Sequence, residues 1–275
     1  MLKVFSAKKT IFIAAVALMI IGLNSHVASS KQAHKIQTQS VIQSSSQISE
    51  DKPLVLSDNT ASTAKTVYKR TPAFTQYKPR YGAIQVHPSN YGDRHKVDVN
   101  GKALNNMTLV VLHETTNSAV SAINTFRTYH PNDNDQVSYH VLIALDGTII
   151  YLVPSEKRAF GAGNSAFKGS NGIEAVQTNP NIAASVNNFA YHVSLETPVD
   201  GRGKANQNSH SGYTEEQYKS LAWLVALSEI PEERITTHQD VDRSGRRFDP
   251  RSFDRNKFLA ILRSYRQPVD ETSLN

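Results

Sequence analysis

Two histidines and one aspartate, far apart along the chain, are the residues whose types best suit a metal centre. His113 follows an apolar run, His238 follows a β-branched run, and Asp249 comes eleven residues after His238. Two imidazoles and a carboxylate from separate loops match a catalytic zinc, which takes three protein ligands and keeps a fourth position for water. A lone histidine at a strand end is more often structural, so the interpretation depends on convergence of all three residues. They predict one Zn²⁺ per chain.

Three further residues could complete the chemistry around such a metal. Glu196 follows a predicted strand and could act as general base, although a solvated charge at a strand end is the commoner case. Arg247 lies close to the aspartate and could stabilise a negatively charged oxygen, although loop arginines are usually only solvated. Tyr139 and His140 are neighbours on one predicted strand, so their side chains point to opposite faces. Only one of these two can readily line the cleft.

The elements that would position these residues alternate between strands and helices. Asp146-Gly147, between two β-rich runs, is a strong hairpin signal, and Thr214 to Gln217 forms a capping box at the start of a helix. The order predicts an α/β fold, a single domain with a central mixed β-sheet flanked by helices. Strands are expected at 107–112, 137–145, 148–153, 189–195 and 235–237, and helices at 118–129, 214–228 and 253–265.

The first 29 residues have the features of an export signal. Lys3, Lys8 and Lys9 precede the apolar run 11–23, whose 13 residues are fewer than the roughly 20 that a membrane-spanning helix needs. Such a segment is typical of a secretory signal peptide, with an uncleaved N-terminal anchor as the alternative. We therefore expect an exported protein, either periplasmic, associated with the cell wall or secreted. No stable membrane span is expected once the signal is cleaved.

The composition of the rest of the chain indicates its domain organisation and the kinds of partner it can bind. Residues 30–75 are rich in Ser, Gln and Thr and predict a flexible linker, so the folded domain is expected at 76–268 and a short tail at 269–275. The chain has no cysteine, which excludes disulfides. Half of the net charge of +6 comes from the three signal-peptide lysines, and the mild remainder does not indicate nucleic-acid binding.

Several short motifs occur in a fixed order between about residues 109 and 258, over half of the chain. They are VLHET at 111–115, VSYHVLI at 137–143, DGTI at 146–149, RAFGAG at 158–163, VSLE at 193–196, and the segment 238–250. With these motifs the sequence resembles the zinc-dependent N-acetylmuramoyl-L-alanine amidases. Their type-2 amidase domain is shared with phage amidases and peptidoglycan recognition proteins. Each motif is weak alone, but together and in this order they are specific.

The resemblance implies roles for particular residues. It implies that the zinc ligands are His113, His238 and Asp249. It also implies that Glu196 is the general acid/base.

It further implies that Tyr139 faces the cleft, with His140 facing outward. This sequence departs from the family pattern in two places. Many members have a lysine where this chain has Arg247, which cannot lose its proton. The run around Gly161 often carries a histidine that is missing here, which affects the expected substrate contacts of residues 161–164.

The function implied by the resemblance is hydrolysis of the amide between N-acetylmuramic acid and L-alanine. The partner would be peptidoglycan or its muropeptide fragments. Two alternatives stay open from the sequence: a non-catalytic peptidoglycan-binding module on the same fold, and a zinc hydrolase for another cell-wall amide. Segments 163–184 and 199–212 could be substrate-groove loops or plain surface loops. His210, within the second segment, is expected at the surface.

Overall fold

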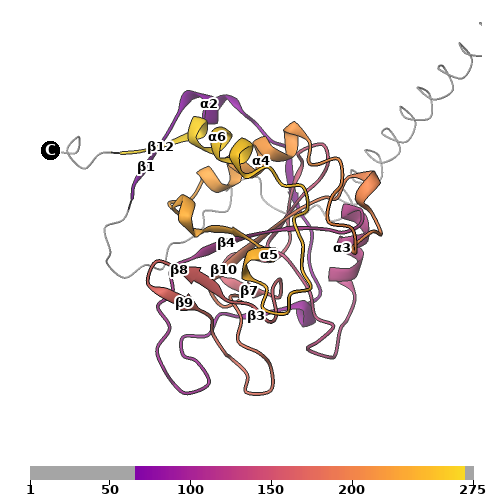
Figure 1. Cartoon of the computed structure of the whole chain (residues 1–275), viewed down its shortest axis with the longest axis vertical. Coiled ribbons are helices and arrows are strands. Elements are labelled where there is room, and N and C mark those ends of the chain that lie inside the picture. The colour runs from indigo at the N-terminus through magenta and orange to yellow at the C-terminus, as the bar shows by residue number, and fades with distance from the viewer. Residues whose placement is uncertain (1–65, 270–275) are drawn as a thin grey trace, which may run out of the picture. The chain divides into compact units, whose positions relative to one another are not determined.

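The computed structural model describes residues 66–269 (Figure 1). The predicted signal peptide 1–29, the predicted linker up to residue 65 and the tail after residue 269 lie outside the described residues. Residues 66–269 fall within one compact unit. Within this range, no helix is both long enough and apolar enough to cross a membrane.

A mixed six-stranded sheet lies at the centre. β4 and β10 run parallel, with His113 opposite Ser194 in the register, and Figure 1 shows these two strands side by side. β5 and β6 form the antiparallel hairpin predicted around Asp146-Gly147. The predicted fold class, one mixed sheet with flanking helices, is confirmed. The strand order is β11 (Ile235–Thr237), β4 (Leu109–Glu114), β10 (Ala190–Leu195), β5 (Val141–Ile143), β6 (Ile149–Tyr151) and β2 (Tyr81–Ala83).

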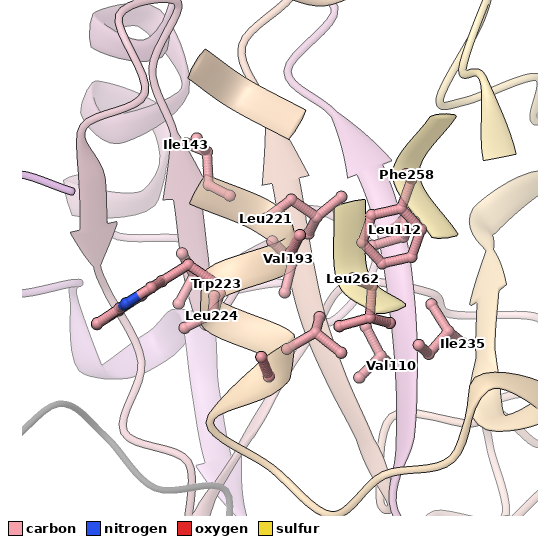
Figure 2. Close-up of a cluster of buried hydrophobic side chains, with 14 of the residues drawn as sticks. Val110, Leu112, Ile143, Val193, Leu221, Trp223, Leu224, Ile235, Phe258 and Leu262 are labelled. Carbon is pink, nitrogen blue, oxygen red and sulfur yellow. The ribbon is translucent and has the colours of Figure 1, made fainter. Parts of the chain in front are cut away.

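Two helices, α4 (Glu215–Ala226) and α6 (Arg255–Tyr265), pack on one face of this sheet. Figure 2 shows their apolar side chains meeting those of the central strands, with Leu221 and Phe258 close to Leu112. All three of these side chains are fully buried. Burial of such a side chain stabilises the fold by about 1.5–3 kcal/mol. The capping box predicted at the start of α4 is present.

The opposite face of the sheet carries the polar residues that matter for function. Because side chains alternate along a strand, the residues of β4 that do not face α4 and α6 are Leu109, Val111 and His113. β10 contributes Ala190 and His192 to the same face, and both are fully buried. Helix α3 (Ala119–Arg127) follows β4, and Ser118 caps it.

The domain begins earlier than the predicted boundary at residue 76. β1 (Tyr68–Arg70) pairs antiparallel with β12 (Arg266–Pro268) at the other end of the chain. The buried guanidinium of Arg266 lies 4.0 Å from the ring centre of Tyr68, and it donates hydrogen bonds to carbonyls at the end of α4. Helix α2 (Pro72–Gln76) stacks Phe74 on Trp223 at 5.7 Å between ring centres. The residues around β1 and α2 therefore belong to the folded domain.

Several short elements were not expected from the sequence. The segment 163–184 is not a plain surface loop, because it contains an antiparallel hairpin in which Glu174 forms an ion pair with Arg234. His238 begins a short helix instead of lying in a loop. The additional elements are β3 (Tyr91–Asp93), β7 (Lys157–Ala159), β8 (Phe167–Gly169), β9 (Gly172–Glu174), α5 (His238–Val241), and the 3-10 turns η1 (Pro88–Asn90), η2 (Val199–Gly201) and η3 (Glu232–Arg234).

Candidate metal centre

The structure brings His113, His238 and Asp249 together. One ligand atom from each residue can be chosen so that all three lie within 4.8 Å of one another. Asp249 lies between the two imidazoles, with Oδ2 at 3.4 Å from His113 Nδ1 and Oδ1 at 3.1 Å from His238 Nδ1. His113 is fully buried, and the other two are 7% and 8% exposed. Three residues separated by up to 136 positions in the sequence thus form one group of oxygen and nitrogen donors.

Regular structure holds the two histidines, and a backbone hydrogen bond holds the segment of Asp249. His113 is the fifth residue of β4, inside the strand and not at its end as predicted, and it is the register partner of Ser194 in β10. His238 is the first residue of α5, which Thr237 caps by accepting a hydrogen bond from Asp240 N. The backbone N–H of Gln239 donates to Asp249 O at 3.0 Å. That bond ties the segments carrying His238 and Asp249 to each other.

The protonation states suit a divalent cation. Burial lowers the pKa of His113 to about 4, so its imidazole is neutral at neutral pH. Burial alone would raise the pKa of Asp249, but its contacts with His113 and His238 outweigh this effect and hold that pKa well below its ordinary value. Neutral imidazole and ionised carboxylate are the forms that bind metal. His113 Nδ1 is buried and has no hydrogen-bond partner among the described residues. The donor set therefore fits zinc.

Tyr139 lies against this group, as predicted. Its ring stacks on that of His113 with centres 4.5 Å apart, and Phe126 packs edge-on against it at 5.3 Å. Burial, followed by the charge of Asp249, raises the pKa of Tyr139 above its ordinary value, so the hydroxyl stays protonated as a donor. His140 does not face outward as expected. It is fully buried, because its ring packs behind the site against neighbouring rings of β10.

Arg247 lies on the exposed loop that leads to Asp249. The Asp242 carboxylate shapes that loop by accepting hydrogen bonds from the backbone N–H groups of Arg246 and Arg247, at 2.9 and 3.1 Å. The Arg247 guanidinium is exposed and close enough for its charge to act on the pKa values of His113 and Tyr139. Its predicted role in stabilising an oxyanion stays a prediction.

Glu196 is held by other contacts. Its side chain is fully buried, and Oε1 accepts hydrogen bonds from Ala119 N at 3.0 Å and Arg202 Nη2 at 2.9 Å. Oε2 accepts a third from Leu145 N at 3.0 Å. The carboxylate thereby joins the start of α3, a guanidinium and the β5–β6 hairpin. Glu196 is outside the three-residue group, and its role as general acid/base stays a prediction.

Two buried residues close to the group of His113, His238 and Asp249 were not predicted from the sequence. The first is Glu114. On the face opposite His113, its carboxylate accepts hydrogen bonds from Arg251, from His210 Nε2 at 2.9 Å and from the Tyr213 hydroxyl at 3.0 Å. Arg251 also donates to three carbonyls of the 199–212 segment. That segment is therefore anchored. The surface position expected for His210 is wrong, because its side chain is fully buried.

The second residue is His192, whose Nδ1 lies 2.9 Å from His113 Nε2. Both imidazoles are fully buried, and burial lowers the pKa of His192 well below its ordinary value. The signal that could have found it is the alternation in the buried strand β10, where His192 and Ser194 are the polar residues on the face that also carries His113. The two ring nitrogens of His113 therefore lie in distinct environments, with Nδ1 toward Asp249 and Nε2 toward His192.

Several solved structures are similar to this chain. An AmpD derivative is similar at 23% sequence identity, covering 66% of this chain and 94% of that one, with a TM-score of 0.43. AmpD from Citrobacter freundii is similar at 25% sequence identity. The match covers 67% of this chain and 90% of that one, with a TM-score of 0.40. The endolysin N-acetylmuramoyl-L-alanine amidase LysCS from Clostridium intestinale is similar at 16% sequence identity. The match covers 68% of this chain and 97% of that one, with a TM-score of 0.41. No curated protein sequence matches significantly.

A family match over residues 103–252 carries the assignment, because it covers more than half of the 275 residues. The matched family is described as N-acetylmuramoyl-L-alanine amidase. The matched range includes all three residues of the metal group, and the resemblance noted in the sequence is confirmed. The chain belongs to the N-acetylmuramoyl-L-alanine amidase family and is an enzyme of that class.

Proposed function

We propose that this amidase is a zinc enzyme that hydrolyses the bond between N-acetylmuramic acid and the L-alanine of the stem peptide. The observation that carries the proposal is the convergence of His113, His238 and Asp249 in a buried group with the donor chemistry of a catalytic zinc site. Peptidoglycan or muropeptides would be the substrate, in keeping with the family to which the chain belongs.

Different residues of the chain would bind the metal and stabilise the reacting carbonyl group. His113, His238 and Asp249 would hold the metal, which when bound lowers the pKa of water to about 7 and polarises a carbonyl. Tyr139, protonated and stacked on His113, would donate a hydrogen bond toward the reacting carbonyl oxygen. The exposed guanidinium of Arg247 would add positive charge where negative charge develops.

Proton transfer is the role predicted for Glu196. A general base takes a proton from the attacking water and then returns it to the departing alanine nitrogen. The carboxylate of Glu196 accepts hydrogen bonds from Ala119 N, Leu145 N and Arg202 Nη2 in the structure. Chemistry by Glu196 therefore has to be separated experimentally from its contacts with Ala119, Leu145 and Arg202.

Digestion of purified peptidoglycan followed by mass analysis tests the reaction. With zinc supplied, the expected products are peptides that begin with a free L-alanine amine and glycan chains with a free lactyl carboxylate, heavier together by one water per bond cleaved. Treatment with a chelator should stop the reaction, and added Zn²⁺ should restore it. A new amine on another residue would show that a different wall amide is cleaved. Absence of any product with zinc-loaded protein would contradict the proposal.

We also propose that the protein is exported to the periplasm, the cell wall or the medium. The support is the sequence of residues 1–29, with its lysines and its apolar run 11–23. Expression in a bacterial host, with N-terminal sequencing of the recovered protein, should find a new N-terminus near Ala28 or Ser29. Protein that keeps Met1 and stays with the membrane fraction would show an anchor instead. Protein that keeps Met1 in the soluble cell fraction would contradict export.

A further inference from the structure

The protein-facing side of His113 has an unusual neighbour. Metal-binding histidines nearly always donate their second ring N–H to a carboxylate, a backbone carbonyl or water. Here the atom 2.9 Å from His113 Nε2 is Nδ1 of another imidazole, His192. If His113 Nδ1 faces the metal group, as its 3.4 Å distance to Asp249 indicates, then Nε2 carries the hydrogen and His192 Nδ1 accepts it.

His192 is itself held in place from behind. Its backbone N–H donates to His140 Nδ1 at 2.9 Å, and its carbonyl accepts from His140 N at 3.0 Å. The two rings stack at 5.8 Å with 11° between their planes. His140 Nε2 donates to Lys157 O at 3.1 Å, which leaves His140 Nδ1 as an acceptor. The imidazole of His192 therefore has a defined position and orientation.

The backbone opposite makes room for this ring. A Cβ atom at Gly161 would lie 2.5 Å from His192 Nδ1 and 2.6 Å from its Cγ, both far inside contact distance. Gly161 does not have positive φ, so its lack of a side chain serves space and not backbone conformation. The point of closest approach is the nitrogen that faces His113. The His192 ring can therefore occupy this position only because residue 161 is a glycine.

We propose that His192 is a positioning residue for the metal centre, which accepts the Nε2–H of His113 and so fixes the ring orientation and tautomer needed for Nδ1 to bind the metal. The proposal rests on the zinc site of the proposed function and adds to it a neutral imidazole as the acceptor. Such an acceptor orients the ligand without adding a negative charge behind it. The electron-withdrawing effect of the metal on its substrate is then not reduced by a buried carboxylate.

Two kinds of substitution at His192 separate hydrogen bonding from packing. In His192→Asn the side-chain oxygen takes nearly the place of Nδ1 and can still accept from His113. In His192→Leu the side chain fills similar space but accepts no hydrogen bond, and His192→Val provides a second such variant if the leucine protein does not fold. Circular dichroism of each metal-free protein establishes that it is folded before metal is added.

The measurement is zinc affinity, by competition with a chromophoric chelator, together with the visible absorption of the Co²⁺-loaded protein. We expect His192→Leu or Val to bind zinc about 10–100-fold more weakly than wild type, as for other outer partners of metal ligands. His192→Asn should stay within about threefold and keep the Co²⁺ spectrum. Wild-type affinity in the leucine or valine protein, or equal losses in the asparagine and leucine proteins, would overturn the role of His192. Wild-type protein that binds no zinc would instead overturn the proposed function.

Discussion

Replacing His238 with alanine is expected to abolish stoichiometric zinc binding and to lower kcat/KM by about a thousandfold or more. His238 supplies one of three ligand atoms that lie within 4.8 Å of one another, and two ligands do not make a stable catalytic zinc site. The Lewis acidity of such a metal is worth several kcal/mol, and about 4 kcal/mol corresponds to roughly a thousandfold in rate. Zinc content and peptidoglycan hydrolysis would be measured on the same samples.

His95→Ala is the matched control for the His238 variant. His95 is exposed, and only its backbone makes hydrogen bonds in the described part of the chain, with Asn188. The control should keep one zinc per chain and wild-type turnover. The assignment of His238 as a ligand would be wrong if His238→Ala retained stoichiometric zinc and wild-type hydrolysis.

Glu196→Gln is expected to give two separable losses. Turnover should fall by at least about a hundredfold while zinc stays bound, because a positioned general acid/base typically contributes 10²–10⁴-fold. The free energy of unfolding should also fall by about 3 kcal/mol, since the change removes one partner of a buried ion pair with Arg202. Denaturant unfolding gives the second quantity, and hydrolysis assayed where the variant is fully folded gives the first.

Arg202→Met separates chemistry from structure in this experiment. It breaks the same ion pair and leaves the fully buried Glu196 carboxylate without its guanidinium partner, so a loss of the same order, about 3 kcal/mol, is expected. Its turnover should stay close to wild type. If both variants lost turnover equally, the effect would come from the junction with α3. If Glu196→Gln kept full turnover, Glu196 would be a structural residue only.

Much of the candidate metal centre could be predicted because its residues lie next to strongly patterned elements. The apolar run before His113 and the β-branched run before His238 mark strands, and parallel strands bring their carboxyl ends to one edge of a sheet. The structure confirms this for β4 and β11. The hairpin at Asp146-Gly147 and the caps at Ser118 and Thr214 were also predictable, since each depends on a few adjacent residues.

The residues that escaped prediction depend on contacts between distant segments. Glu114 reads as an ordinary polar residue, yet it meets Arg251, 137 positions away, in a fully buried ion pair. His210 lies in a stretch of Gly, Asn and Ser that indicates a surface loop, and its buried hydrogen-bond partner, the Glu114 carboxylate, lies 96 positions away. The contact between His192 and Gly161 likewise cannot be predicted from the residues next to either of them in the sequence. Short edge strands such as β1 have no pattern of their own and form because β12 lies beside them.

The pairing of β1 with β12 has a consequence for how the domain can be engineered. Tyr68 is the register partner of Pro268, so the two ends of the folded domain lie a strand spacing apart, about 5 Å. A few glycine and serine residues would join them without strain, and the chain could then be opened elsewhere, for example at the exposed turn between β8 and β9. Such a circular permutant would carry its fusion partners on the hairpin while keeping β4, β10 and β11 in their native order of pairing.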